Sequence, residues 1–464
     1  MKKTIATTLA LGACIVLPAL AVAGNDALLQ VLQNKGILTA DEVARIGHQP
    51  ETDANAALVR LLRQKGVISA DEAKKIAGKE NEAARPATAI TPEEHKALSV
   101  LKGWSIGVLS YLDYSAGQKA LTDGRSESYN RFSLTRGYLT VKKKVNSWLS
   151  GRMTTDIHRD STEGASTYGD YTVRLKYLYA EFRPDDLGFL TNMKVEAGQG
   201  HTPWLDFEEH VNPYRVQGTM ATDRAGVQGS SDLGLSLQGY FGGTLADAVA
   251  RTGNHHYDGR YGSWHIGLYN GSGYHSEEVN GDKAIEGRLT LRPLPDAAPG
   301  LQFSYLGIYG EGNKDYPGSG APDYRVNLGM VSYEHPLGIL TAQYYQSTGN
   351  ASGTWTYGPN HEALDTAGYS FFGRVRLPFI SSKLSLLARY DHFDEDVDDH
   401  IANDTAYDMY LAGLSYDLTD SNRIVLVYEN TDYENDAGVK HKLPVPGNNL
   451  GDDDRFQVAY RLAF

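Results

Sequence analysis

Basic side chains recur at alternate positions in several segments of the chain, and this spacing could place positive charges along one face of each segment, where they would attract anions. In residues 285–292, Arg288 and Arg292 share the parity of Glu286 and Thr290, while aliphatic side chains occupy most positions between them. On a strand these two sets point to opposite faces. Nine basic residues have this parity, opposite the apolar face of their segments: Arg152, Arg174, Lys176, Arg288, Arg292, Arg374, Arg376, Arg389 and Arg461. Charged rings set the ion preference of a lumen, so these residues predict attraction of anions. The alternative is that they pair with loop carboxylates and line a weakly selective lumen.

The longest connection, residues 201–231, concentrates polar and aromatic groups that could narrow such a lumen. Its prolines and aromatic side chains allow it to pack against other parts of the chain, so it can fold inward. The residues that we expect at the constriction are His201, Trp204, Asp206, Glu208, Glu209, Tyr214 and Arg215. Their histidines and carboxylates match no zinc spacing such as His-Glu-x-x-His. We therefore expect no metal site, and no motif in the chain predicts a cofactor.

Strands are the elements that must hold these side chains. Residues 454–464 alternate between small or polar and apolar or aromatic side chains, and they end on Phe464. A polar inner face and an apolar outer face suit a barrel embedded in lipid. From Trp104 onward, about sixteen such segments are joined by connections that are alternately short and long. The chain is therefore predicted to be all-β, with a transmembrane antiparallel β-barrel of about sixteen strands in residues 104–464. Residues 242–263 are too long for a short turn, so about fourteen or eighteen strands are the alternatives.

Composition agrees with this class. After the N-terminal leader no stretch reaches the roughly 18 consecutive apolar residues of a membrane helix. The mean hydropathy is −0.40, as expected when half of each strand faces water. The net charge of −13 argues against binding of nucleic acid.

The start of the chain predicts export. Lys2 and Lys3 precede an apolar run that ends in small residues at Ala21 and Ala23, so residues 1–23 are interpreted as a signal peptide. The only cysteine, Cys14, lies within it. The alternative is a lipoprotein signal with Cys14 lipidated, but the apolar run continues well beyond Cys14. Export together with a barrel predicts the outer membrane of a Gram-negative bacterium, in contact with lipid and lipopolysaccharide.

A small α-helical segment in residues 24–77 is expected to lie in the periplasm. Residues 27–46 and 57–76 repeat each other with a period of about 30. Each unit predicts a helix that ends at a glycine, then a second helix capped by Thr39 or Ser69 with a glutamate three residues later. The units could pair or trimerise with neighbouring chains as an assembly module, or contact the cell wall. Residues 78–103 are interpreted as a linker.

Several stretches resemble the phosphate-selective porin O and P family. They are Arg136-Gly137-Tyr138-Leu139, Gly198-Gln199-Gly200-His201-Thr202-Pro203, Gly267-Leu268-Tyr269-Asn270-Gly271-Ser272-Gly273-Tyr274 and Gly287-Arg288-Leu289-Thr290-Leu291-Arg292-Pro293. The resemblance covers residues 104–464 and implies a trimer of sixteen-stranded barrels that passes small anions. In that family phosphate specificity depends on an arginine ladder and a lysine cluster, which are not complete in this chain.

These features predict an outer-membrane porin for passive diffusion of small hydrophilic solutes, with a preference for anions that could include phosphate. A barrel enzyme would need a Ser–His or Asp–His pair near the membrane interface, and no local motif singles one out. We therefore expect no catalytic activity. The rival interpretation is a sleeve that holds a partner such as a cytochrome, whose haem would belong to the partner because this chain has no Cys-x-x-Cys-His.

Overall fold

The chain forms two compact units, residues Met1–Lys102 and Gly103–Phe464, which are described separately here. The computed structural model describes residues 26–47, 51–73, 102–121, 125–160, 166–401, 405–434 and 451–464. The predicted signal peptide, residues 1–23, lies outside the described residues. So does the predicted linker, residues 78–103, except for its last two residues.

Helices make up the first unit, and the predicted caps are present. The helices are α1 (Asp26–Asn34), α2 (Ala40–Gly47) and α3 (Glu51–Gln64). The N–H of Thr39 donates to the Glu42 carboxylate at 2.8 Å, and the N–H of Glu42 donates back to the Thr39 hydroxyl at 3.4 Å. Ser69 and Glu72 make the same reciprocal pair at 2.8 and 3.2 Å. Each pair satisfies N–H groups that a helix start leaves free, which explains the repeated Thr/Ser-x-x-Glu pattern.

The two repeats share one small core. Leu29, Leu38, Ile46 and Leu58 are all buried in a single cluster. Lys65 of the second repeat reaches the Glu42 carboxylate of the first at 2.6 Å. The repeats therefore pair within one chain, which is one of the two arrangements that their sequence allowed.

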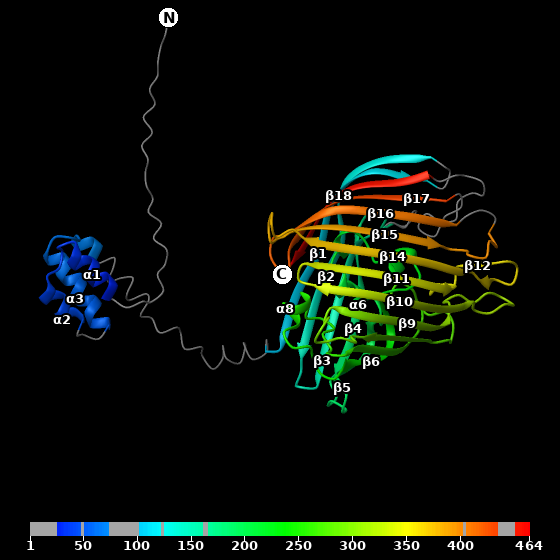
Figure 1. The fold of residues 1–464 in the computed structure, drawn as a ribbon, viewed down its shortest axis with the longest axis horizontal. Coiled ribbons are helices and arrows are strands. Elements are labelled where there is room, and N and C mark those ends of the chain that lie inside the picture. Colours follow the sequence, from blue (N-terminus) through cyan, green and yellow to red (C-terminus); the bar gives the residue numbers. More distant parts are fainter. Residues whose placement is uncertain are drawn as a thin grey trace, which may run out of the picture. The chain divides into compact units, whose positions relative to one another are not determined.

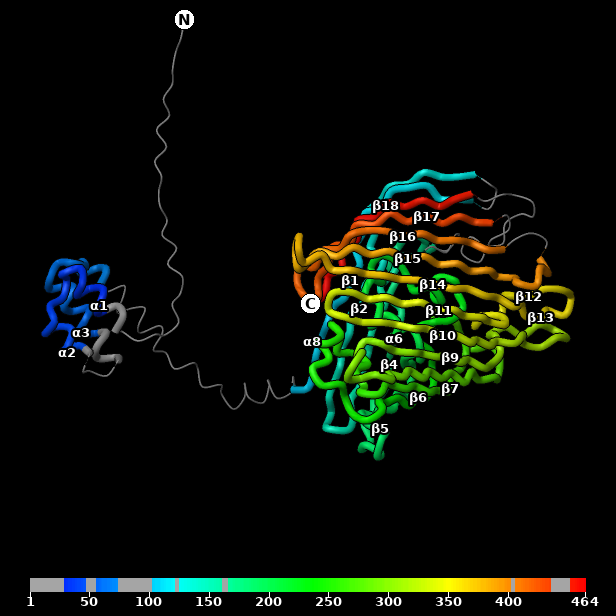
Figure 2. The backbone as a smooth tube through the Cα atoms, viewed as in Figure 1, coloured from blue at the N-terminus to red at the C-terminus, as the bar shows by residue number. Residues whose placement is uncertain are grey.

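The second unit is a closed barrel of sixteen antiparallel strands, which confirms the predicted fold. The strands are β1 (Trp104–Ala120), β2 (Ser126–Lys144), β3 (Leu149–Arg159), β4 (Tyr171–Phe182), β5 (Leu190–His201), β6 (Ser231–Phe241), β7 (Gly262–Tyr269), β8 (Ala284–Leu291), β9 (Leu301–Glu311), β10 (Asp323–His335), β11 (Gly338–Thr348), β14 (Asp365–Arg376), β15 (Leu384–Asp394), β16 (Ala406–Asp417), β17 (Arg423–Tyr433) and β18 (Gly451–Ala463). Strand β18 closes on β1, with Tyr460 opposite Leu112, so that no edge is left unpaired. The first strand lies beside the last in both views (Figures 1 and 2). A two-stranded hairpin, β12 (Thr356–Tyr357) and β13 (Glu362–Ala363), lies in the connection between β11 and β14.

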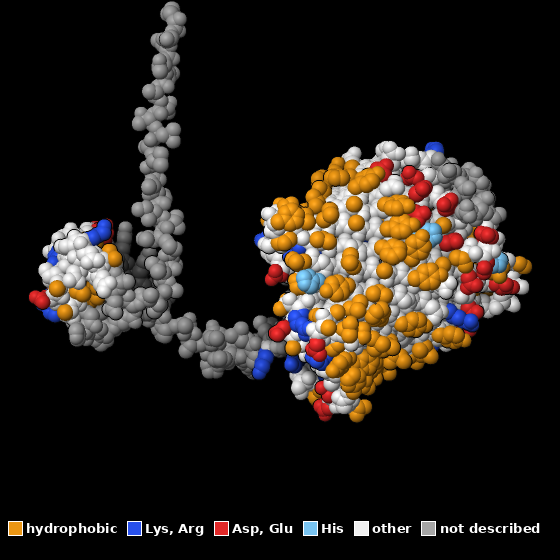
Figure 3. All heavy atoms as spheres, viewed as in Figure 1, with side chains coloured by type: hydrophobic (Ala, Val, Ile, Leu, Met, Phe, Trp, Pro, Cys, Tyr) orange, Lys and Arg blue, Asp and Glu red, His pale blue; other side chains and the backbone are white. Residues whose placement is uncertain are grey.

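An apolar outer surface covers the barrel, as the alternation predicted. Ile285 and Phe371 are exposed on the outside, and so is Phe456 on the closing strand. Hydrophobic side chains gather across the visible barrel face, and acidic side chains gather at one end of it (Figure 3). Apolar side chains exposed around a closed sheet are what lipid requires.

None of the described helices is long and apolar enough to cross a membrane.

The connections differ at the two ends of the barrel. Short turns such as the one between β10 and β11 lie at one end, called here the turn end, and long connections lie at the other, the loop end. Residues 242–263 join β6 to β7 at the turn end and contain helix α8 (Ala248–Thr252) and a bridge between Thr244 and Gly259. The strand register holds on both sides of this segment, so it is an insertion and does not change the number of strands.

Candidate functional site

The connection between β5 and β6 lies inside the barrel. It forms α6 (Leu205–Val211), a 3-10 turn η1 (Arg215–Gln217) and α7 (Ala221–Ala225). Trp204, Leu205 and Phe207 are completely buried, in one core with inward side chains of β9 to β11 such as Leu328. Apolar residues on the inner face of these strands therefore meet apolar residues of the loop. This part of the lumen is packed, in contrast to the water-filled interior expected for a barrel of this width.

Arginines of the barrel wall bind the loop backbone. Arg389 Nη1 donates to the carbonyl oxygen of Thr219 at 2.6 Å, and Arg423 Nη1 donates to that of Pro213 at 3.1 Å. Arg455 Nη2 donates to the carbonyl oxygen of Gln217 at 2.9 Å. These bonds satisfy carbonyl groups that a loop inside a barrel would otherwise bury without a partner.

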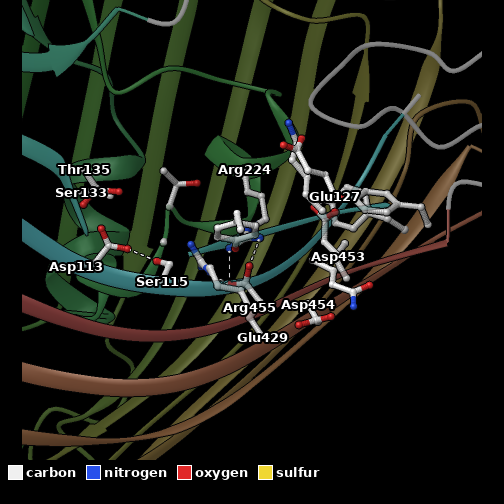
Figure 4. Close-up of a pocket in the computed structure, with 18 of the residues that line it drawn as sticks. Asp113, Ser115, Glu127, Ser133, Thr135, Arg224, Glu429, Asp453, Asp454 and Arg455 are labelled. Carbon is white, nitrogen blue, oxygen red and sulfur yellow. Dashed lines mark hydrogen bonds and ion pairs between the residues drawn. The ribbon is translucent and has the colours of Figure 1, made fainter. Parts of the chain in front are cut away.

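Ion pairs add to this anchoring at the tip of the loop. Arg224 of α7 makes two bonds to the Glu429 carboxylate, at 3.2 and 3.0 Å, and Arg455 reaches the same carboxylate at 2.8 Å. Figure 4 shows these three residues together. The loop is thus attached through both its backbone and its side chains.

Six of the nine residues predicted to line an open lumen bind groups of the loop, the barrel wall or the turn end in the structure. Arg288 is buried, donates to the carbonyl oxygen of Pro203 at 2.9 Å and stacks over Phe207 at the base of the loop. Arg389 is buried beside Asp391 as well as Thr219. The other four bind turn-end groups: Arg292 to the Gly259 carbonyl, Arg374 to the Pro336 carbonyl, Arg376 to Asp417 and Arg461 to the Ser421 carbonyl. The alternative interpretation was that these arginines pair with loop carboxylates. In this set most partners are backbone carbonyl groups, and the two carboxylates, Asp391 and Asp417, belong to strands β15 and β16.

The remaining three predicted residues lie on one wall, formed by β2 to β4. Together with Arg136 and Lys142 they make the basic wall: Arg136, Lys142, Arg152, Arg174 and Lys176. Arg174 and Arg136 both reach the buried carboxylate of Asp156, at 2.9 and 3.7 Å. Lys176 Nζ donates to the hydroxyl of Tyr138 at 2.9 Å.

Arg136 and Lys142 were not among the predicted residues. The reason for Arg136 is a bulge: Tyr111 lies opposite Arg136 but Leu112 lies opposite Leu134, so Thr135 is an extra residue and the inward parity changes there. For Lys142, the alternation with Leu139 and Val141 predicts an inward side chain. Two further lysines follow Lys142 directly, and this run of lysines obscured the alternation.

The loop presents a charged face to β1 and β2. Arg215 pairs with Glu209 and, at 3.1 Å, with Asp223. Burial alone would lower the pKa of Arg215, but Glu209, Tyr138, Asp223 and Tyr111 outweigh it and hold the pKa well above its usual range. The turn η1, which contains Arg215, lies against β18, the strand next to β1, and Tyr111 of β1 belongs to the same hydrophobic cluster as Val216.

The base of the loop is a second polar cluster. His201 accepts from Arg152 Nη1 at its Nε2 atom, at 3.2 Å, and its Nδ1–H donates to the Glu196 carboxylate at 2.9 Å. The Tyr257 hydroxyl, from the insertion, donates to Asp206 at 2.5 Å. Burial would raise the pKa of Asp206, but His210 and His201 outweigh it and hold that pKa well below its usual range. Among the described residues, no group of three histidines, cysteines or carboxylates is arranged to hold a metal ion.

The seven predicted loop residues therefore divide between two sides. His201, Asp206, Glu209 and Arg215 lie toward β1 to β4. Trp204, Glu208 and Tyr214 lie away from β1 to β4. Glu208 accepts hydrogen bonds from Trp204 and from Gln343 of β11, and the hydroxyl of Tyr214 is hydrogen-bonded to that of Ser415 of β16. In the first group His201 and Arg215 are buried and Asp206 and Glu209 are half-buried, and the second group fixes the loop.

Two cavities open at opposite ends of the β1 to β4 side. The mouth cavity, at the loop end, has a volume of about 900 Å³ (Figure 4). Its lining includes Asp113, Ser133 and Thr135 of β1 and β2 and Gly218, Thr219, Asp223 and Arg224 of the loop. The turn-end cavity, of about 360 Å³, is lined by Lys142, Arg152 and Tyr179, among others. Tyr138, Arg136 and Arg215 lie between the two.

Comparisons with known proteins support the fold. No family model matches the chain, and no curated protein sequence matches it. The anion-selective porin from Comamonas acidovorans is similar in structure, with a TM-score of 0.51 and 12% identity over 78% of this chain and 100% of that one. OmpF of Salmonella typhi has a TM-score of 0.52 and 11% identity over 77% of this chain and 97% of that one. These likenesses identify the barrel as the fold of Gram-negative outer-membrane porins.

Proposed function

We propose that this chain is an outer-membrane porin in which small hydrophilic solutes diffuse between the inward loop and the basic wall, with a preference for anions. The observation that carries the proposal is the basic wall itself, which begins at the turn-end cavity with Lys142 and Arg152 and continues toward the mouth cavity. Elsewhere the loop packs tightly against strands β9 to β18, and the two cavities lie on the β1 to β4 side.

Charge supports the preference for anions. The wall carries five cations, and two carboxylates, Asp156 and Glu181, face them from β3 and β4. Lys142 extends into the turn-end cavity, where Lys144 and Arg183 add positive charge. Fields of one sign in a narrow low-dielectric space concentrate counter-ions. Phosphate is one candidate solute, because the planar guanidinium groups of Arg136, Arg152 and Arg174 suit its oxygens.

The packed lumen also bears on the rival functions. A sleeve would need an interior wide enough for a folded partner, whereas here the loop and the insertion occupy it. We propose neither a cytochrome partner nor catalysis. The general, weakly selective porin is the second candidate, because the mouth cavity has seven carboxylates and only four basic residues.

Assembly and location are part of the proposal. We propose export through residues 1–23, residence in the outer membrane, and a homotrimer as the family resemblance implies. Residues 24–77 would then lie in the periplasm as an assembly or cell-wall module.

A planar bilayer holding the purified protein tests this function. We expect single-channel conductance, a reversal potential of anionic sign across a KCl gradient, and reduced chloride current when phosphate is added. A cation-selective reversal potential would contradict the role of the basic wall and leave a general porin. The absence of conductance from folded protein would refute the porin proposal.

A further inference from the structure

The mouth cavity contains a buried carboxylate that pairs with no cation among the described residues. Glu395 follows β15, lines the cavity and is 4% exposed. No hydrogen bond or ion pair joins its side chain to another residue in the described part of the chain. Burial, reinforced by the neighbouring Asp396 and Asp394, raises the pKa of Glu395 to about 7. A buried carboxylate is costly unless a cation or donor meets it, so this group is ready for a positively charged ligand.

Aromatic rings line the same cavity as this carboxylate. Phe393 and Tyr407 line the same cavity with ring centres 5.9 Å apart, and Tyr433 lies 6.2 Å from Tyr407. The hydroxyl of Tyr407 is buried and has no partner among the described residues. Aromatic faces attract ammonium groups, most strongly where water is excluded.

The mouth cavity is lined by four basic groups and seven carboxylates. Arg224 and Arg455 are both held by Glu429, at 3.0 and 2.8 Å. The other two, Lys119 and Arg131, belong to β1 and β2, and Arg131 lies over the ring of Tyr129. Across the cavity Asp113 is buried, and its Oδ1 atom has no partner among the described residues. The cavity therefore has an excess of negative charge, in contrast to the basic wall deeper in the barrel.

We propose that the mouth cavity is a binding site for the organic ammonium group of a small solute, with Glu395 as the carboxylate that receives it. A bare inorganic cation fits less well, because the cavity of about 900 Å³ is lined partly by aromatic rings. In addition, the described residues contain no cluster arranged as a metal site. Binding at the mouth does not require conduction, so it can be tested apart from the porin function.

Isothermal titration calorimetry of the full-length protein in detergent, with 1,5-diaminopentane at low salt, tests the site. We expect saturable binding to the wild type, about tenfold weaker binding to Glu395→Gln, and none to Glu395→Lys, whose own ammonium would occupy the place. Glu277→Gln is the matched control, since Glu277 is an exposed carboxylate of another loop and does not line the cavity. It should bind as the wild type does.

Three results would overturn the proposal. One is the absence of saturable heat with the wild type, and another is equal affinity of Glu395→Gln and the wild type. The third is Glu395-dependent binding of Mg²⁺ without binding of the diamine, which would make this an inorganic cation site. A folded barrel that has not been heated runs on a denaturing gel as a compact band. Retention of this band shows that each variant has folded, and the measurement does not depend on conductance.

Discussion

At the scale of single residues, arginine serves two purposes in this barrel. Arg288, Arg389 and Arg455 donate to loop carbonyl groups, because the guanidinium group supplies several donors in fixed directions. Arg136 and Arg174 instead share one carboxylate, Asp156, and therefore keep a net positive charge on their wall. Position relative to the loop, and not residue type, separates the two purposes.

Removing one charge from the wall should weaken the preference for anions. For Arg136→Gln we expect the permeability ratio of chloride to potassium to fall by about twofold, since one unit charge at short range in a screened aqueous pore changes ion energies modestly. The ratio is obtained from reversal potentials. Arg325→Gln is the control, because Arg325 is exposed and pairs with Asp323 away from the wall; an equal fall in the control would refute a local role for Arg136.

Removing the carboxylate between the two arginines should act in the opposite direction. Asp156→Asn keeps the size of the side chain but frees the charges of Arg174 and Arg136. We expect the same permeability ratio to rise by about twofold. An unchanged ratio in a folded variant would mean that permeating ions do not pass near Asp156.

At the scale of elements, the loop between β5 and β6 decides the shape of the lumen. One side of it packs into the apolar core, and the other presents Glu209 and Arg215 toward β1 and β2. Its position depends on bonds to four separate strands, β8, β15, β17 and β18. Loosening one anchor should therefore increase its motion without unfolding the barrel.

Glu429 anchors the loop through Arg224, and we expect its substitution to have the largest effect on single-channel current. Glu429→Gln removes the charge that holds both Arg224 and Arg455, at 3.0 and 2.8 Å. We expect a loss of about 1–3 kcal/mol of loop stability, visible as current flicker in single-channel records. Glu362→Gln, on an exposed hairpin, is the control. Single-channel records of Glu429→Gln without added flicker would show that the hydrogen bonds to the loop backbone are enough to hold the loop in place.

Glu208 should make the docking of the loop depend on pH. Burial raises its pKa from 4.5 to about 7, against the opposing influence of Arg389. The docked loop then binds a proton more strongly than the undocked one, so docking is most stable below about pH 4.5 and loses stability as pH rises to about 7. The cost of ionisation is on the order of 3 kcal/mol.

Hydrogen exchange of residues 205–225, followed by mass spectrometry, measures this dependence. After correction for the intrinsic rates, we expect weaker protection at pH 8 than at pH 5 in the wild type. In Glu208→Gln, which cannot ionise, the protection should be the same at both values. Equal pH dependence in the wild type and the variant would assign the effect to another group.

At the scale of the whole molecule, the barrel and the helical segment are independent units. The helices have their own core of Leu29, Leu38, Ile46 and Leu58. The barrel closes on itself through β1 and β18.

Deletion of residues 24–77 should therefore leave the pore intact. With the leader kept, we expect unchanged single-channel conductance and ion preference, measured in the same bilayers as the full chain. A lower yield of oligomer with normal conductance would favour an assembly role for the helices. Altered conductance of the folded barrel would contradict the independence of the two units.

The sequence by itself determined the local features. Alternation over residues 454–464 and 285–292 identified strands and their outer faces, because side-chain direction has a period of two and lipid accepts only apolar groups. The Thr39–Glu42 and Ser69–Glu72 caps could also be predicted from the sequence, since each is a hydrogen bond between residues three positions apart. A barrel of about sixteen strands followed from repetition of such local signals, and the structure decided between sixteen and the alternatives of fourteen and eighteen.

Only the tertiary structure decided which inward residues face water. Arg288 and Arg152 have the same parity in the sequence, yet Arg288 holds Pro203 while Arg152 lies on the wall beside His201. The difference depends on where residues 201–231 fold, and their partners, Ser415 and Thr219 for example, come from distant strands. Bulges such as the one at Thr135 also change the inward face within a strand. Contacts of this kind join residues far apart in the chain, and no spacing pattern records them.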